Sequence, residues 1–229
     1  MRIVAIIPAH NEEQFIGEVV WKTLEYVDAV YVVDNLSTDK TARIATSYGA
    51  IVISEWTKGA GAATSAGWNI AKGLAKIGHC NILVTLDGDG QHNPHDIPRI
   101  IEPILKGEAD VVFGSRFMGK NNIPAYRKLG IWIITICCDI GRSKRELYDA
   151  QCCLRAFNLP AIMGIDLTDN GFGFSIEEIM KARKLKLRIK EVPVECVYRG
   201  LKSDSTMNPI KHGISVLLKV FEWRLRLWI

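Results

Sequence analysis

The sequence predicts an α/β fold with a mainly parallel sheet flanked by helices. Short runs of β-branched and aliphatic residues alternate with longer amphipathic segments through the first half of the chain. This alternation is typical of parallel strands that helices cover on both faces. The 229 residues are enough to bury a full core, and 48% hydrophobic with 24% charged residues is the balance of a globular protein.

The strands of the first half are expected, in order, at residues 3–7, 29–33, 51–54, 82–86 and 111–114. Apolar residues at helical spacing predict helices between them, at residues 12–26, 38–48, 61–77 and 94–105. Ligands of open parallel sheets bind beyond the carboxyl ends of the strands. The residues that follow each strand are therefore the candidates for chemistry.

The second half is more apolar and also carries basic residues. Residues 131–140 are nearly all apolar and follow Arg127 and Lys128, a pattern that fits either a core helix or a helix at a bilayer surface. A further helix is expected at residues 171–184 and a strand at 187–198. Apolar residues recur at helical spacing over residues 210–228 with cations between them, which predicts an amphipathic, interfacial helix.

Composition excludes several classes of protein. The net charge of +4 is mild, so nucleic acid is not an expected partner. The six cysteines show no zinc spacing and are expected to be reduced, mostly buried thiols of a cytoplasmic protein. The strand-like start of the chain is broken by Pro8 and is too short for a signal peptide, and no run of 18 apolar residues predicts a membrane span.

Polar residues follow four of the predicted strands and should share one rim of the sheet. They are Pro8-Ala9-His10-Asn11-Glu12, residues 34–39, Asp87-Gly88-Asp89-Gly90-Gln91-His92, and Ser115-Arg116. Two carboxylates with one residue between them, as in Asp87 and Asp89, can reach the same hard cation, which would stabilise a diphosphate leaving group. Asp-Gly pairs are also common in solvated turns, but the position after the fourth strand favours the metal site. An EF-hand is excluded because no glutamate follows at the required spacing.

These motifs resemble those of family-two glycosyltransferases, which have the GT-A fold. The resemblance rests on PAHNE, VDNLSTDKT, DGDGQH and GSR. Within the family, YRKLG, DAQCCLRAF, GFGFSIEE and KEVPVECVYRG resemble the dolichol-phosphate-mannose synthases and other polyprenyl-phosphate sugar synthases, over residues 1–215. The segment SDSTMNPIKHG resembles archaeal-type members, some of which use UDP-sugars.

The resemblance implies a Rossmann-like GT-A catalytic domain at residues 1–200 and a C-terminal amphipathic helix at 201–229 that contacts a membrane surface. Within the domain, residues 1–116 would bind the nucleotide-sugar and the metal, and residues 117–200 would form the acceptor-side half. The protein would then lie peripherally at the cytoplasmic face of the membrane.

The resemblance also implies roles for single residues. The nucleotide-sugar would be bound by Pro8, Ala9, His10, Glu12, Asp34, Asn35, Lys58, Gly59, Asp87, Gly88 and Asp89. Mg²⁺ or Mn²⁺ would be held by Asp87, Asp89 and Gln91. The catalytic set would be Asp89, Gln91, Arg116, Arg127 and Arg199, of which the three arginines would bind the acceptor phosphate. The sequence departs from the family at three places: Asn35 stands where a second aspartate is frequent, Cys152-Cys153 where serine or glycine is usual, and Gly173 where glutamate or another larger residue is frequent.

The implied activity is inverting transfer of a hexose from a nucleotide-sugar to dolichyl or polyprenyl phosphate. GDP-mannose, UDP-glucose and UDP-N-acetylglucosamine all remain candidate donors. An acceptor phosphate is already ionised at neutral pH, so it needs arginines rather than a general base.

Other readings remain open. A family-two enzyme with a sugar hydroxyl acceptor would need a carboxylate base. A nucleotidyltransferase would need a glycine-rich basic loop near the N-terminus, and a catalytically dead nucleotide-sugar-binding protein would not need the intact Asp87, Asp89 and Gln91. No GxGxxG follows the first strand, which argues against a dinucleotide oxidoreductase.

Overall fold

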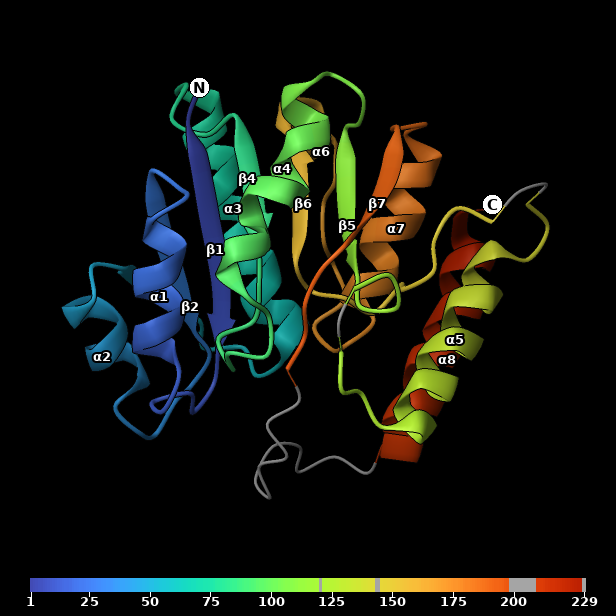
Figure 1. Ribbon diagram of the computed structural model, residues 1–229, viewed down its shortest axis with the longest axis horizontal. Helices are drawn as coiled ribbons and strands as arrows, with labels where there is room; N and C mark the ends of the chain where they lie inside the picture. Colours follow the sequence, from blue (N-terminus) through green and yellow to red (C-terminus); the bar gives the residue numbers. More distant parts are fainter. Residues whose placement is uncertain (120, 143–144, 198–208, 228–229) are drawn as a thin grey trace.

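A computed structural model describes residues 1–119, 121–142, 145–197 and 209–227 of the chain. Its centre is a seven-stranded sheet with the order β3-β2-β1-β4-β6-β5-β7 (Figure 1). The strands are β1 (Ile3–Ala9), β2 (Ala29–Asp34), β3 (Ile51–Ser54), β4 (Ile82–Thr85), β5 (Val111–Ser115), β6 (Arg155–Asn158) and β7 (Ile189–Pro193). The helices are α1 (Ile16–Leu24), α2 (Thr41–Ser47), α3 (Ala60–Lys76), the 3₁₀ turn η1 (Pro94–Asp96), α4 (Ile97–Leu105), α5 (Ala125–Asp139), α6 (Leu159–Gly164), α7 (Phe174–Lys184) and α8 (Pro209–Leu227).

All strands except β6 run in the same direction. β6 lies between β4 and β5 and is antiparallel to both of them. The ends of β1, β2, β4 and β5 therefore meet at one side of the sheet, which we call the carboxyl edge; it is the lower edge in Figure 1. This arrangement confirms the mainly parallel sheet and places the four predicted polar clusters on one rim.

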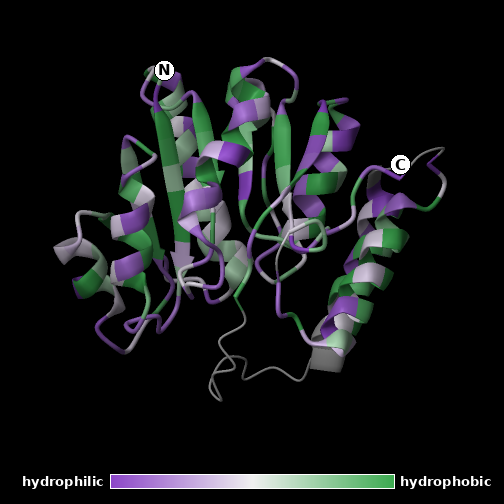
Figure 2. Ribbon diagram, in the orientation of Figure 1, coloured by the Kyte–Doolittle hydropathy of each residue, from purple (hydrophilic) through white to green (hydrophobic). Residues whose placement is uncertain are grey.

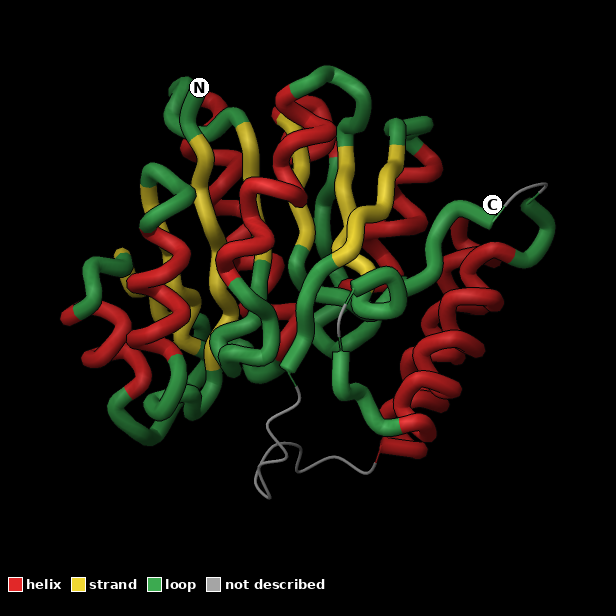
Figure 3. The backbone as a smooth tube through the Cα atoms, viewed as in Figure 1, coloured by secondary structure: helices red, strands yellow, loops and turns green. Residues whose placement is uncertain are grey.

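Helices cover both faces of the sheet, because successive strand residues point to opposite sides (Figure 3). On one face, Ala5 and Ile7 of β1 belong to a core shared with α1, α2 and α4. On the other face, Val4 and Ile6 belong to a core shared with α3, α5, α6, α7 and α8. Strands β1, β4 and β5 at the centre of the sheet are accordingly mostly hydrophobic (Figure 2).

Helices α5 and α8 lie side by side beyond the β7 end of the sheet (Figure 1). The carbonyl of Cys138, near the end of α5, accepts hydrogen bonds from Arg183 of α7 at 2.6 Å and from Arg224 of α8 at 3.2 Å. These bonds satisfy a helix-end carbonyl that has no partner within the helix. The three helices are therefore joined at one point.

The α5–α8 pair presents an exposed apolar surface, which we call the hairpin face. It is formed by Tyr126, Leu129, Trp132, Ile133, Ile136, Ile214, Leu218, Phe221 and Leu225. Only Ile134, Thr135 and Cys138 of α5 are buried. The sequence allowed either a core helix or a surface helix at residues 131–140. The segment has features of both, since one side packs on the core and the other is exposed. Within the described ranges, no helix is both long enough and apolar enough to cross a bilayer.

The predicted strands and helices of the first half are present, with shifted ends. The helix expected from residue 12 begins only at Ile16, because the Glu12 carbonyl accepts turn hydrogen bonds from Phe15 and Ile16. The strand expected at 187–198 ends at Pro193. Neither β6 nor α6 was predicted, since their short sequences show no clear period.

The six cysteines are free thiols, as expected, and four of them are buried. Burial raises the pKa of the Cys80 and Cys138 thiols to about 12, so both are protonated at neutral pH.

Candidate active site

The ends of β1 and β2 are joined directly at the carboxyl edge. The Asn35 amide donates to the Ala9 carbonyl at 2.8 Å, and the exposed His10 ring donates through Nδ1 to the Asn35 carbonyl at 2.6 Å. The Glu12 amide donates to the Thr41 hydroxyl at 2.7 Å. These bonds hold the segment that begins at Pro8 against the segment that follows β2.

The side chain of Asn35 is fully engaged with the backbone of residues 55–59, which we call the donor loop. Its Nδ2 donates to the Glu55 carbonyl at 3.1 Å and to the Thr57 carbonyl at 2.7 Å, and its Oδ1 accepts from the Gly59 amide at 2.8 Å. Asn35 is buried, whereas Lys58 is exposed. The geometry thus makes Asn35 the support of the donor loop, rather than a direct contact to a base or ribose as the resemblance implied.

Asp34 has a different environment from its neighbour. Its side chain is half-buried, and the buried Oδ1 atom has no hydrogen-bond partner among the described residues. Buried carboxylate oxygens are normally paired, so this oxygen is available to a ligand at the rim. The nucleotide-contacting role expected for Asp34 stays a prediction.

Asp87 and Asp89 follow β4 directly and are both half-buried. The Gln91 amide donates to Asp89 Oδ1 at 2.9 Å across Gly90, whose φ of +68° favours glycine. The described residues contain no cluster of three His, Cys, Asp or Glu side chains that could hold a metal alone. Two carboxylates suit a cation that completes its shell with diphosphate oxygens and water. The Asp87–Asp89 pair therefore fits the expected Mg²⁺ or Mn²⁺.

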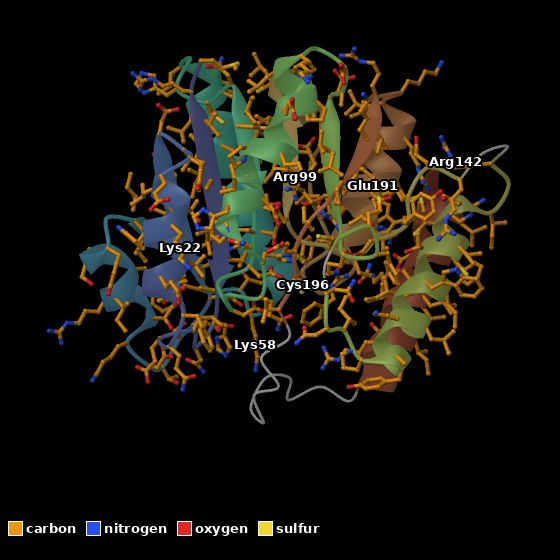
Figure 4. The ribbon with its side chains drawn as sticks, viewed as in Figure 1. Lys22, Lys58, Arg99, Arg142, Glu191 and Cys196 are labelled. Atoms are coloured by element: carbon orange, nitrogen blue, oxygen red, sulfur yellow. The ribbon has the colours of Figure 1, made fainter. Side chains whose placement is uncertain are left out.

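Two residues that were given no role from the sequence adjoin the acidic pair, the buried His92 and the half-buried Cys153. His92 is buried and forms a strand-like bridge with Cys196, which lies with Lys58 toward the carboxyl edge (Figure 4). Burial lowers the pKa of His92 to about 4 despite the nearby Asp87, so the ring is neutral at physiological pH. Burial of the Cys153 thiol raises its pKa, and the neighbouring Asp87, with which the thiol interacts, raises that pKa further.

A small cavity opens beneath Asp87. It is lined by Pro8, Thr64, Thr85, Leu86, Asp87, Cys153, Arg155 and Phe174. Arg155 is 1% exposed; its Nη1 pairs with the buried Glu178 and donates to the Ser175 carbonyl, while Nε and Nη2 donate to the carbonyls of Cys152 and Ala150. The antiparallel strand β6 thus places a buried arginine–glutamate ion pair at the cavity that Asp87 lines.

Arg116 is 7% exposed and binds a partner within the protein. Its Nε donates to Asp149 Oδ2 at 2.7 Å and its Nη2 to Oδ1 at 2.8 Å, and its backbone amide also reaches Asp149. Burial alone would lower the pKa of Arg116, but Asp149 outweighs it and raises that pKa. A lipid phosphate would have to compete with this bidentate pair, so the geometry favours a structural role for Arg116.

The other two predicted phosphate ligands lie elsewhere. Arg127 is half-buried in the first turn of α5, and its Nε donates to the Tyr126 hydroxyl at 3.3 Å. Helix α5 begins on the side of the molecule to which the strands point (Figure 1). Arg199 lies outside the described residues, so its assignment stays a prediction.

The doubly covered, mainly parallel sheet, with an acidic pair at the end of β4, defines the molecule as a GT-A glycosyltransferase. The profile of the family "Glycosyl transferase family 2" matches residues 4–159. The chain belongs to this family.

Two curated relatives are similar over nearly the full chain. The UDP-N-acetylglucosamine–dolichyl-phosphate N-acetylglucosaminyltransferase of Methanococcus voltae is 32% identical, with 86% of this chain and 86% of the relative covered. The undecaprenyl-phosphate mannosyltransferase of Micrococcus luteus is 30% identical, with 94% and 95% covered. Both names specify a lipid phosphate as the acceptor.

Solved structures share the fold at low identity. The glucosyl-3-phosphoglycerate synthase of Mycobacterium tuberculosis, in complex with Mn²⁺, UDP and phosphoglyceric acid, superimposes with a TM-score of 0.73 at 19% identity. The match covers 99% of this chain and 78% of that chain. At this identity the match shows the GT-A fold alone.

Proposed function

We propose that this glycosyltransferase moves a hexose from a nucleotide-sugar to a polyprenyl or dolichyl phosphate at a membrane surface, with inversion at the anomeric carbon. The observation that carries the proposal is the position of the hairpin face. It lies on the helix pair whose α5 begins, at Ala125, on the side of the carboxyl edge of the sheet (Figure 1), and Arg127 is in the first turn of that helix. The two lipid-phosphate transferases among the relatives support the same acceptor.

The donor half of the site is built around the ends of β1, β2 and β4. Asp34 would contact the nucleoside, and Lys58 and Gly59 of the donor loop would cover the nucleotide. Asp87 and Asp89, with Gln91 beside them, would hold the divalent cation. When bound, that cation would neutralise the diphosphate and make it a better leaving group.

The acceptor half needs positive charge rather than a base. The phosphate oxygen of the lipid would attack the anomeric carbon as the bond from that carbon to the donor diphosphate breaks, and the nucleoside diphosphate would depart. Arg127, together with Arg199 outside the described residues, is the candidate for orienting the lipid phosphate. Guanidinium groups suit this task because they bind phosphate through two parallel hydrogen bonds.

The hairpin face would hold the enzyme at the bilayer. Trp132 and Phe221 are 46% and 46% exposed, and Leu218 is 64% exposed. An amphipathic surface of this kind binds a membrane interface through its apolar side chains. A peripheral position at the cytoplasmic face would bring the acceptor phosphate to the α5 end of the site.

The proposal is tested by the fate of a labelled sugar. Purified protein, Mn²⁺ and labelled GDP-mannose, UDP-glucose or UDP-N-acetylglucosamine are incubated in parallel with polyprenyl phosphate in detergent. Label should enter the organic phase with at least one donor and should be released by mild acid. If label moves only onto an oligosaccharide and stays aqueous, the hydroxyl-acceptor reading is correct instead.

A further inference from the structure

Helix α3 follows the donor loop directly. The first turn of this helix is hydrogen-bonded to a second loop. The Ala62 amide of α3 donates to the Asn170 carbonyl at 3.2 Å. A Cβ at Gly59 would lie 2.1 Å from that carbonyl oxygen, and a Cβ at Gly61 would lie 2.0 Å from the Asp169 carbonyl oxygen. Only glycine at both positions lets the backbone of residues 168–172, which we call the clamp loop, reach this segment.

The clamp loop is itself held by buried carboxylates. Glu177 of α7 is fully buried and accepts from the Thr168 amide at 2.9 Å, the Thr168 hydroxyl at 2.7 Å and the Asp169 amide at 2.9 Å. Asp169 Oδ1 accepts from the Gly171 amide at 2.8 Å. One oxygen of Asp169 is thus committed to the shape of the loop.

The other oxygen of Asp169 binds the C-terminal helix. Lys219 Nζ of α8 lies 3.0 Å from Asp169 Oδ2 and 2.9 Å from Glu222. The Asp169 side chain is 6% exposed and that of Lys219 is 36% exposed, so the pair is partly shielded from water. The pair fits beside residue 173 because that residue is a glycine. A Cβ at this position would lie 2.6 Å from Asp169 Oδ2 and 2.9 Å from Lys219 Cγ, which is too close for both side chains.

We propose that Asp169 and Lys219 are positioning residues for donor binding, which connect α8 through the clamp loop to Gly59 and the donor loop. The inference rests on the proposed nucleotide-sugar donor but not on the identity of the acceptor. Loss of the pair leaves a shielded carboxylate without its cation, so the clamp loop shifts and the donor loop is less often in its binding conformation. The departure of Gly173 from the family is then explained, since a larger residue there would displace the pair.

Lys219→Met should weaken donor binding by roughly 3- to 30-fold, the range usual for a residue that acts through intervening contacts. The dissociation constants of UDP and GDP with Mn²⁺ are measured by calorimetry on the full chain, and donor KM, acceptor KM and kcat follow from the transfer assay. The donor constants should rise while acceptor KM and kcat change little. A merely structural role would impair donor binding, acceptor binding and kcat together.

Three further variants distinguish the effect of losing the Asp169–Lys219 ion pair from the effect of destabilising α8 in general. Lys219→Arg keeps the charge and should restore donor binding. Arg226→Met removes an ion pair of the same helix, to Glu222, and a contact with the Trp223 ring, but no contact with Asp169, and should leave donor binding unchanged. Gly173→Ala keeps both charges and a compatible backbone, since φ at this position is −69°, but its Cβ displaces the pair, so it should weaken donor binding as Lys219→Met does.

The outcomes are distinct. If the wild-type chain binds neither nucleotide and transfers no sugar, the proposed function fails. If the wild type binds a nucleotide while Lys219→Met and Gly173→Ala bind it equally well, the positioning role fails. It also fails if Arg226→Met weakens binding as much as Lys219→Met.

Discussion

Asp34 and Asn35 are adjacent in the chain, yet their side chains have different partners. Asn35 is hydrogen-bonded to three backbone groups of the donor loop, and Asp34 has a buried oxygen without a partner among the described residues. An asparagine suits the supporting position because its amide both donates and accepts. An aspartate at position 35 could accept from Gly59 but could not donate to the two carbonyls.

Asn35→Asp should therefore raise the donor KM by roughly 10-fold, because it places a carboxylate against two carbonyl oxygens of the donor loop. Steady-state kinetics with varied donor measure the change. The matched control is Asn81→Asp, because the Asn81 side chain accepts a hydrogen bond from the Arg2 amide and an aspartate can do the same. Equal donor KM values for the two variants would contradict the supporting role of Asn35.

Asp89→Ala should lower kcat/KM by roughly 100- to 1000-fold, since it removes one of two carboxylates from the cation and leaving-group site. Saturating Mn²⁺ should not restore the rate. Asp89→Asn is the companion variant, because its amide oxygen can still accept from the Gln91 backbone and preserve the turn. Transfer near the wild-type rate by Asp89→Asn would show that the charge of Asp89 does not bind a metal.

Strand β6 is short and lies between β4 and β5, but its two end residues make contacts at both edges of the sheet. It begins with the buried Arg155 under the acidic pair, and it ends at Asn158, which donates to Asp110 at 2.8 Å. Asp110 also accepts from the Arg188 amide and guanidinium, so one carboxylate joins the starts of β5 and β7 to the end of β6. Asp110 therefore connects three strands at the edge of the sheet opposite the active site.

Asp110 should make stability depend on acid pH. Hydrogen bonds from Arg188 lower the pKa of Asp110 from 3.8 to about 2, although burial acts in the opposite direction. Because the folded pKa lies below the unfolded value, the stabilisation is present above about pH 4 and is lost as the pH falls toward 2. Urea unfolding of the wild type and Asp110→Asn should therefore differ at pH 6 and converge near pH 2.

The exposed pair of Glu108 and Lys190 provides the control for this measurement. Their side chains are 48% and 46% exposed, so Glu108→Gln should change the free energy of unfolding little at any pH. A constant difference between the wild type and Asp110→Asn from pH 6 to pH 2 would contradict the assignment.

The sequence predicted the elements with a strong period and the polar residues at the strand ends. It did not predict β6, because four residues that start with a buried arginine show no alternation. It also assigned Arg116 to a ligand, since the pairing with Asp149 joins residues 33 positions apart and depends on how the strands meet. The support given by Asn35 and the clamp loop depends in the same way on long-range backbone contacts that no local pattern reveals.

At the scale of the whole molecule, the sheet and the hairpin face have separate tasks. The sheet carries the proposed donor half, and α5 and α8 form a flank whose ribbons include many hydrophobic residues (Figure 2), several of them exposed. Since Lys219 lies on α8 and binds Asp169, the flank is connected to the donor half through the clamp loop.

The double variant Leu218→Glu with Leu225→Glu should reduce binding to vesicles of phosphatidylcholine and phosphatidylglycerol by at least about 10-fold. Each leucine contributes on the order of 1.5–3 kcal/mol when its side chain leaves water, and a glutamate would be repelled by the anionic lipid. Cosedimentation measures the bound fraction. The control is Ile77→Glu, which changes a 66% exposed residue at the end of α3, away from the hairpin face. Equal binding by the double variant and the control would contradict membrane docking through α8.

The position of β6 also has a consequence for synthesis of the chain. When residues up to 115 have left the ribosome, β4 can pair with β1 on one side, but its other edge has no strand to meet until residues 155–158 emerge. β5 is made before either of its two neighbours, β6 and β7. During that interval the nascent protein presents an unpaired, apolar strand edge of the kind that chaperones protect and that drives aggregation. Strand β6 ends the exposure of β4 and of one edge of β5, and the other edge of β5 stays unpaired until residues 189–193 of β7 emerge.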